Sequence, residues 1–240
     1  MSFLAYFKTR SKKMEFSLTK IHLALIGISW RKLKNYEEFI EINNSLGNIF
    51  SEEPELRSAT IQPPNIPFML EMAGVPLIIA KDQDTMCEFT AAKERADFFS
   101  GIKSQENLNF FIEKSHALLK HYNMVKRLGI IASYTVEVSN EPKWFSESIF
   151  STNVDNFSEV SIRYNTKKMF KQLFESNKII QIQEFPIFNN VEKSCNAKRI
   201  TLQIDINTPQ GYELVSKQAN DFFNQKIKTI SLIAGESILK

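Results

Sequence analysis

The sequence contains 7 glycines among its 240 residues, against 20 phenylalanines. Loops that let the backbone approach a phosphate closely, as in dinucleotide-binding and phosphate-binding motifs, need several glycines at fixed spacing. The sequence also has no GxSxG, GKS, GKT, HExxH or CxxC pattern. It therefore gives no support to nucleophilic hydrolysis, phosphoryl transfer or zinc chemistry.

Cysteine and histidine are equally scarce. Cys87 and Cys195 have no partner at metal-ligand spacing, and the apolar run around Cys87 predicts a buried thiol. His116 and His121 are five residues apart, whereas two zinc ligands on one helical face would be four apart. His22 lies in a hydrophobic strand, where we expect a core histidine bonded to the backbone. We expect no metal site and no cofactor.

Long hydrophobic runs are missing as well. The longest, Ile21 to Ile28, is far shorter than a membrane span. The apolar patch Phe3 to Phe7 is too short for a signal peptide, and its charges follow it instead of preceding it. Together with the rarity of cysteine, this favours a soluble protein of a reducing, cytoplasmic compartment.

The net charge of +3 does not mark the whole molecule as a nucleic-acid binder. Residues 1–13 are the local exception, a basic arm with Lys8, Arg10, Lys12 and Lys13. This arm would suit contact with phosphates or with an anionic membrane surface. The simpler interpretation is a solvated terminus, because chain termini are usually poorly ordered, or else an upstream start codon ahead of a native start at Met14.

The hydrophobic content of 43% and the charged content of 24% are those of a globular protein. The clearest pattern lies at residues 198–232, where a strand precedes a proline-glycine break and an amphipathic helix. The strand alternates Ile200, Leu202, Ile204 and Ile206 with Thr201, Gln203, Asp205 and Asn207. The apolar stripe of the helix contains Val215, Ala219, Phe222, Phe223, Ile227 and Ile230.

Earlier segments repeat this order of elements. Residues 14–30 predict an interior strand, 35–47 a helix, 86–91 a strand and 102–121 a helix. A second series then follows, with strands at 127–138, 160–165 and 178–185, a short helix that has Pro142 in its first turn and a helical turn at 167–174. Halves 14–123 and 124–240 thus match as a strand-helix-strands-helix unit, and they could form one continuous domain. Both a duplication and two unrelated runs of common elements explain this match.

We expect an α+β fold with a mainly antiparallel sheet and long helices packed on one face. The strands alternate instead of being uniformly apolar, which leaves the second face open. Aspartate is disfavoured inside strands, so Asp205 and its polar neighbours draw attention to that face. The candidate binding residues there are Arg127, Arg163, Gln183, Gln203, Asp205 and Asn207.

Two interpretations of this polar face remain open. In one, it binds a polar or anionic ligand, and the guanidinium groups of Arg127 and Arg163 bind a carboxylate or phosphate in bidentate fashion. In the other, it is an ordinary solvated sheet face on which Arg163 and Asp205 form a cross-strand ion pair.

Short segments resemble a sporadically distributed bacterial family of about this length whose function is uncharacterised. The similar segments are RLGIIAS at 127–133, SIRYN at 161–165, LQIDINT at 202–208 and DFF at 221–223. The resemblance covers most of the chain beyond Ile61 but not the first fifty residues, and it carries over no catalytic residue. The patchy distribution of that family implies an accessory role at a mobile-element or defence locus, including antiviral defence.

The leading hypothesis is a non-catalytic binding or assembly protein that uses the polar face or a sheet edge. Its partner would be another protein or a second copy of the chain. One alternative is nucleic-acid binding through the basic arm. Another is an enzyme with a site between the halves, which would require His22, Asp205 and Arg163 to lie within reach of one another.

Overall fold

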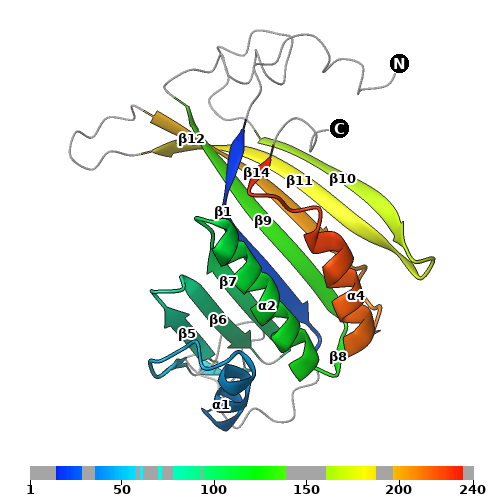
Figure 1. Ribbon diagram of the computed structural model, residues 1–240. Coiled ribbons are helices and arrows are strands. Elements are labelled where there is room, and N and C mark those ends of the chain that lie inside the picture. Colours follow the sequence, from blue (N-terminus) through cyan, green and yellow to red (C-terminus); the bar gives the residue numbers. More distant parts are fainter. Residues whose placement is uncertain are drawn as a thin grey trace.

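The computed structural model describes residues 15–28, 36–57, 60–61, 70–71, 78–92, 94–138, 161–187 and 197–234. Its main layer is a large antiparallel sheet. Two helices, α2 (Gln105–His121) and α4 (Ser216–Ile227), lie across one face of this sheet (Figure 1). The α+β class and the mainly antiparallel sheet expected from the sequence are thereby confirmed.

Strands β1 (Phe16–Ile26) and β9 (Arg127–Val138) form the centre of the sheet, with Leu23 opposite Ile130. Beyond β1 the sheet continues through β7 (Arg95–Gly101), β6 (Cys87–Ala92), β5 (Ile78–Asp82) and β2 (Glu55–Leu56). Beyond β9 it continues through β12 (Ala197–Asn207), β11 (Phe174–Ile187) and β10 (Ser161–Phe170). The short β14 (Ile233–Ala234) pairs with the start of β1. One sheet thus contains strands from both halves of the sequence.

One helix and two short strand pairs among the described residues stand apart from this sheet. Helix α1 (Tyr36–Ser45) packs beside α2. Strand β8 (Met124–Val125) pairs with β13 (Leu214–Val215), and β3 (Thr60–Ile61) pairs with β4 (Leu70–Glu71). None of the helices that the structure describes is long and apolar enough to cross a membrane.

The core lies between the sheet and helices α2 and α4. Phe98 of β7 stacks on Phe111 of α2 with ring centroids 5.5 Å apart, and Phe111 lies 6.4 Å from Phe223 of α4. These large apolar rings dominate the burial that holds the layers together. Helix α2 begins after Ser104, whose Oγ accepts a hydrogen bond from the Asn107 amide at 3.3 Å.

Several expectations from the sequence are confirmed. Cys87 is buried, and β1 is an interior strand paired on both sides. The predicted apolar face of α2 supplies its buried residues Leu108, Phe111, Ser115, Leu118 and Leu119. In β12 the buried residues are the expected Ile200, Leu202, Ile204 and Ile206.

The helical turn predicted at 167–174 is wrong, because these residues form the tip of the β10–β11 hairpin. Phe170 and Phe174 are four residues apart, as on a helical face, but they are opposite each other across the hairpin. Lys171 and Gln172 between them have φ values of 42° and 59°, in the left-handed region that tight hairpin turns use.

Two other expectations need correction. Strand β7 lies between the predicted strand at 86–91 and α2, so it is β7 that directly precedes this helix. Val215 does not belong to the apolar stripe of α4, because it precedes the helix and is 52% exposed. The basic arm, with Lys8, Arg10, Lys12 and Lys13, lies outside the described residues, as do Cys195 and the short helix predicted at Pro142.

Candidate binding face of the sheet

The candidate residues predicted from the sequence share one face of the sheet. Because the four isoleucine and leucine positions of β12 are buried beneath the helices, the residues that alternate with them project from the opposite face. We call this opposite face the open face. Strand register places six predicted residues on it: Arg127, Arg163, Gln183, Gln203, Asp205 and Asn207.

A row of polar side chains crosses five strands of the open face. Arg163 of β10 is opposite Gln181 of β11, which is opposite Gln203 of β12. Gln203 is opposite Ser133 of β9, and Ser133 is opposite Lys20 of β1. Such neighbours lie close enough for their side chains to interact. The row therefore forms a continuous band of amide, hydroxyl and cationic groups.

A second row forms a chain of hydrogen bonds that ends on Asp205. Asn165 Nδ2 donates to Asn177 Oδ1 at 3.4 Å, and Asn177 Nδ2 donates to Asn207 Oδ1 at 3.1 Å. Asn207 Nδ2 then donates to Asp205 Oδ1 at 2.9 Å. Each amide uses its oxygen toward one neighbour and its nitrogen toward the next. These hydrogen bonds fix the amide orientations. They also explain why the polar side chain of Asn207 can be buried, with an exposed fraction of only 2%.

Arg163 and Asp205 do not form the predicted ion pair in the described part of the chain. Arg163 belongs to the row of Gln203, whereas Asp205 is opposite Ile179 of β11, and a full strand separates the two residues. Arg127 is opposite Ile26, at the start of β9 and away from Arg163. The two arginines consequently do not converge on a single ligand.

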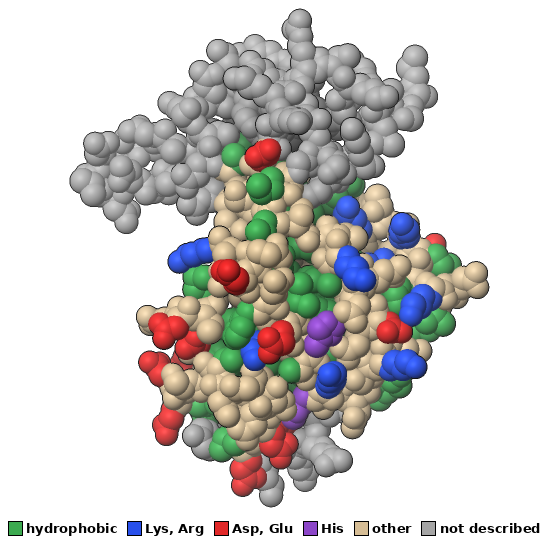
Figure 2. Space-filling view, in the orientation of Figure 1, with side chains coloured by type: hydrophobic (Ala, Val, Ile, Leu, Met, Phe, Trp, Pro, Cys, Tyr) green, Lys and Arg blue, Asp and Glu red, His purple; other side chains and the backbone are tan. Residues whose placement is uncertain are grey.

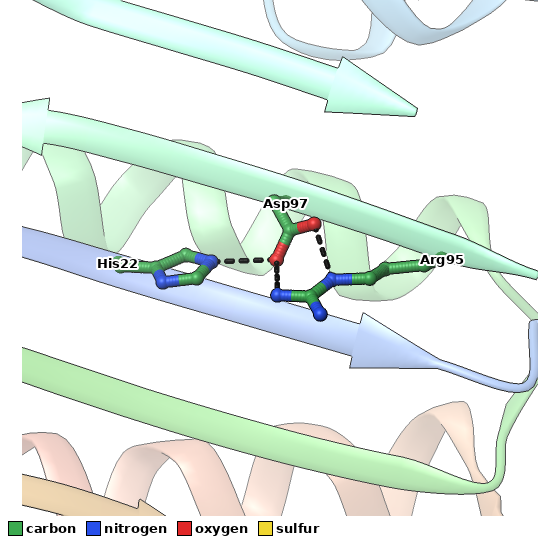
Figure 3. Close-up of polar contacts among 3 residues, drawn as sticks. All are labelled: His22, Arg95 and Asp97. Atoms are coloured by element: carbon green, nitrogen blue, oxygen red, sulfur yellow. Dashed lines mark hydrogen bonds and ion pairs between the residues drawn. The ribbon is translucent and has the colours of Figure 1, made fainter. Parts of the chain in front are cut away.

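An ionic cluster centred on the buried Asp97 occupies the other half of the open face (Figure 3). His22 Nε2 lies 2.6 Å from Asp97 Oδ1, and Arg95 contacts the same carboxylate through Nε at 2.6 Å and Nη2 at 2.9 Å. Burial acts to raise the pKa of Asp97, but the hydrogen bonds and positive charges of His22 and Arg95 lower it below its usual value. His22 also stacks on Phe99, with ring centroids 4.0 Å apart.

This cluster is not among the sites predicted from the sequence. His22 was expected to bond to the backbone, but its partner is the side chain of Asp97, 75 residues away. Asp97 and Arg95 belong to β7, the strand that sequence reasoning did not recognise. The signal in the sequence is the aspartate within the run RADFFSG, because a strand interior disfavours that residue.

His22, Asp205 and Arg163 do not meet in the structure. They lie on β1, β12 and β10, and other strands separate each of these from the next. His22 already shares Asp97 with Arg95. Within the described ranges, no group of three or more His, Cys, Asp or Glu side chains is placed to hold a metal ion.

A cavity of about 650 Å³ lies between the end of α1 and α2, a volume within the usual range for small-molecule pockets. Ser45 Oγ lies 3.4 Å from His121 Nδ1 there, but it donates its hydrogen to the Glu41 carbonyl at 2.9 Å. Lys114 is paired with Glu113 at 2.9 Å. The histidine is therefore not positioned to activate the serine. The lining residues are Asn44, Ser45, Gly47, Glu113, Lys114, His116, Ala117, Lys120 and His121.

Comparison with models of protein families finds no family that matches this chain, and comparison with curated proteins finds no similar sequence.

Proposed function

We propose that the protein is a non-catalytic binding protein and that the open face of its sheet binds a partner protein. The observation that carries this proposal is the band of polar side chains from Arg163 to Lys20. No helix among the described residues covers this face, since α2 and α4 both lie on the other side (Figure 1). Amides and hydroxyls placed side by side present hydrogen-bond donors and acceptors together. The surface of another polypeptide offers both kinds of group in return.

The charges of the open face favour a protein over a nucleic acid. The open face carries both signs of charge: the cations are Lys20, Arg95, Arg127 and Arg163, and the carboxylates are Asp205, Asp97 and Glu88. Carboxylates interspersed among the cations would repel a phosphate backbone. Nucleic-acid-binding surfaces are instead predominantly positive. A polypeptide offers partners for both signs of charge.

We also propose that the fold arose by duplication of one strand-helix-strands-helix unit. The support is the order of elements about the central pair β1 and β9. In each half the last strand of the large sheet before the long helix, β7 or β12, pairs with the central strand of the same half. The next strands outward, β6 and β11, precede those strands in sequence. Equivalent positions of the two halves would then present two related parts of the open face to the partner.

A matched pair of substitutions tests the binding proposal. Gln203→Arg places a long cation in the middle of the open face, and Gln225→Arg makes the same change at an exposed position of α4, on the other side of the molecule. Full-length protein carrying each change is used as bait for proteins from its source cells, and hydrogen exchange then maps the footprint of any captured partner. We expect Gln203→Arg to abolish capture, Gln225→Arg to preserve it, and β9 and β12 to gain protection.

Three outcomes would contradict the proposal. The first is capture that survives Gln203→Arg, and the second is protection confined to the helix side. The third is binding of duplex DNA that weakens steeply with salt and disappears on deletion of residues 1–13, which would establish the basic arm as the functional element.

A further inference from the structure

Three lysines lie on the elements that pack together where α4 crosses the β10–β11 hairpin: Lys168 on β10, Lys178 on β11 and Lys226 on α4. Lys168 is opposite Ser176 and Lys178 is opposite Thr166, so the two lysines are diagonal neighbours. Both alternate in phase with Phe170 and Phe174, whose rings lie 5.2 and 5.8 Å from Phe222 of α4. Figure 2 shows basic side chains gathered on this helix-covered side of the molecule.

Lys226 is unusual because it is a lysine whose side chain is largely buried. Its exposed fraction is 9%, and its Nζ lies 5.5 Å from the centre of the Phe222 ring, one helical turn earlier. The ring face and the negative end of the α4 dipole each offset part of the cost of burying an ammonium. Neither supplies a full negative charge, which a buried cation normally has in a carboxylate or a bound anion.

The carboxylate of Asp221 on α4 is paired with another lysine, Lys171, at 2.8 Å. Glu175 is opposite Met169 and lies on the other face of the hairpin, 3.9 Å from Lys167. Within the described part of the chain, Lys168, Lys178 and Lys226 have no carboxylate within 4.0 Å. The hairpin and α4 together therefore carry three lysines that have no carboxylate partner among the described residues.

The pKa values of two of these lysines are perturbed. Burial lowers the pKa of Lys178 and of Lys226 below the usual value for lysine, and the charge of Lys168 lowers that of Lys226 further. A folded protein gains nothing in stability from such an arrangement. Perturbed ionisable groups of this kind are typical of binding sites.

The hydroxyl of Tyr164 is a fourth polar group on the same face of β10. This residue alternates in phase with Lys168, and it is a diagonal neighbour of Lys178. Its oxygen is buried and has no hydrogen-bond partner in the described structure. A buried hydroxyl without a partner loses free energy that an added acceptor would restore.

We propose that Lys168, Lys178, Lys226 and the Tyr164 hydroxyl bind the phosphate group of a small molecule. Phosphate carries close to two negative charges at neutral pH and several acceptor oxygens, which matches three ammonium groups and one hydroxyl donor. The burial of Lys226 favours a small ligand over a nucleic-acid backbone, whose phosphates would have to reach into the packed corner. This site lies on the helix-covered side, so it is independent of the proposed open-face function.

Lys226→Met is the decisive variant, because methionine keeps most of the apolar stem and removes the charge. Full-length protein is titrated with inorganic phosphate and, in a second arm, with adenosine monophosphate, while the unfolding temperature is recorded. For the wild-type protein we expect that temperature to rise with ligand concentration, as binding to the folded state requires. We expect the variant to unfold at a higher temperature than wild type without ligand and to lose the ligand-induced rise.

Lys168→Ala and Lys228→Ala complete the experiment. Lys168 is exposed, so its replacement should leave the fold intact and weaken phosphate binding about tenfold, the effect of one lost charge-assisted contact. Lys228, an exposed lysine just beyond α4, is the control and should bind as wild type does. A larger rise with adenosine monophosphate than with phosphate would indicate a nucleotide, and equal rises would indicate free phosphate.

The proposal is overturned by any of three results. One is a wild-type unfolding temperature that phosphate does not raise beyond the effect of sodium chloride at the same ionic strength. Another is a rise that Lys226→Met retains. The last is a loss of binding in Lys228→Ala as large as that in Lys168→Ala, which would indicate a diffuse electrostatic effect.

Discussion

His22 on β1 and Asp97 on the adjacent strand β7, 75 residues apart in the sequence, are joined by a contact of 2.6 Å between Nε2 and Oδ1. Arg95, two residues earlier on β7, donates to the same carboxylate. Asp97 is 7% exposed, so this carboxylate depends on its two partners for the interactions that water would otherwise provide.

Replacing Asp97 by asparagine should therefore destabilise the fold. The substitution keeps the shape but leaves the Arg95 guanidinium without its counter-charge, and we expect a loss of about 2 kcal/mol in the free energy of unfolding. Urea denaturation measures this change. Asp84→Asn, in an exposed turn, is the control and should remain within about 0.5 kcal/mol of wild type.

The same carboxylate predicts how stability depends on acid. The pKa of Asp97 is lower in the folded chain than its usual value, so the folded state binds fewer protons than the unfolded state as the pH falls. Its stabilisation is complete above the ordinary aspartate pKa of about 3.9 and is lost as the pH falls through the lowered value. Denaturation curves between pH 6 and pH 2 should show a smaller loss of stability in Asp97→Asn than in wild type. Parallel curves would contradict this assignment.

Glu38 on α1 should have the opposite effect. Burial, and secondarily the charge of Glu41, raise the pKa of Glu38 to about 7. Between about pH 4.5 and pH 7 the folded state holds a proton that the unfolded state releases, so stability falls as the pH rises through this window. Glu38→Gln should remove that fall and be more stable than wild type at pH 8, by about 1 kcal/mol after allowance for partial exposure. Thermal unfolding at pH 5 and pH 8 tests this, with the exposed Glu37→Gln as control.

Gly27 and Gly129 provide a contrast between two glycine-to-alanine substitutions. Gly27 has a φ of 68°, and a Cβ there would lie 2.5 Å from Lys126 Cβ. At Gly129 a Cβ would meet Ala24 and Asn207 at an ordinary 3.8 Å. We expect Gly27→Ala to lower the free energy of unfolding by about 2 kcal/mol and Gly129→Ala to leave it unchanged or raise it by about 0.5 kcal/mol. Equal changes in the free energy of unfolding, measured by urea denaturation, would contradict the prediction that Gly27 requires glycine and Gly129 does not.

Phe111 connects the sheet to both helices of the core, because it stacks on Phe98 and packs beside Phe223. Phe111→Ala should lower the free energy of unfolding by about 4 kcal/mol, the effect of a large cavity in a fully buried position. The neighbouring Phe110 is only partly buried, and Phe110→Ala should have a clearly smaller effect in the same assay.

Local patterns in the sequence predict the parts of the fold that depend on local chemistry. The alternation in β12 identifies the open face, since a strand has only two sides, and Leu108 to Tyr122 give α2 its buried stripe. The hairpin at 170–174 was mistaken for a helical turn because two phenylalanines four residues apart satisfy both geometries.

The sites depend on register and on distant segments, which no local pattern specifies. The amide chain from Asn165 to Asp205 forms because β10, β11 and β12 pair in one particular register. Asp97 can be buried because His22 reaches it from another strand. The three lysines of the proposed phosphate site come from three separate elements, and each one alone resembles an ordinary surface lysine.

The central position of β1 also determines the order in which the protein can be built. Thr19 donates to the Ser133 carbonyl, 114 residues later, and β7 on the other side of β1 is also distant in sequence. During synthesis β1 emerges before β7 and β9, and its two edges stay without these partners until both strands have left the ribosome. Such long-range pairing slows folding and exposes an apolar strand to other chains. We therefore expect newly made chains that end before residue 127 to bind chaperones or aggregate, and full-length chains to fold in a late, cooperative step.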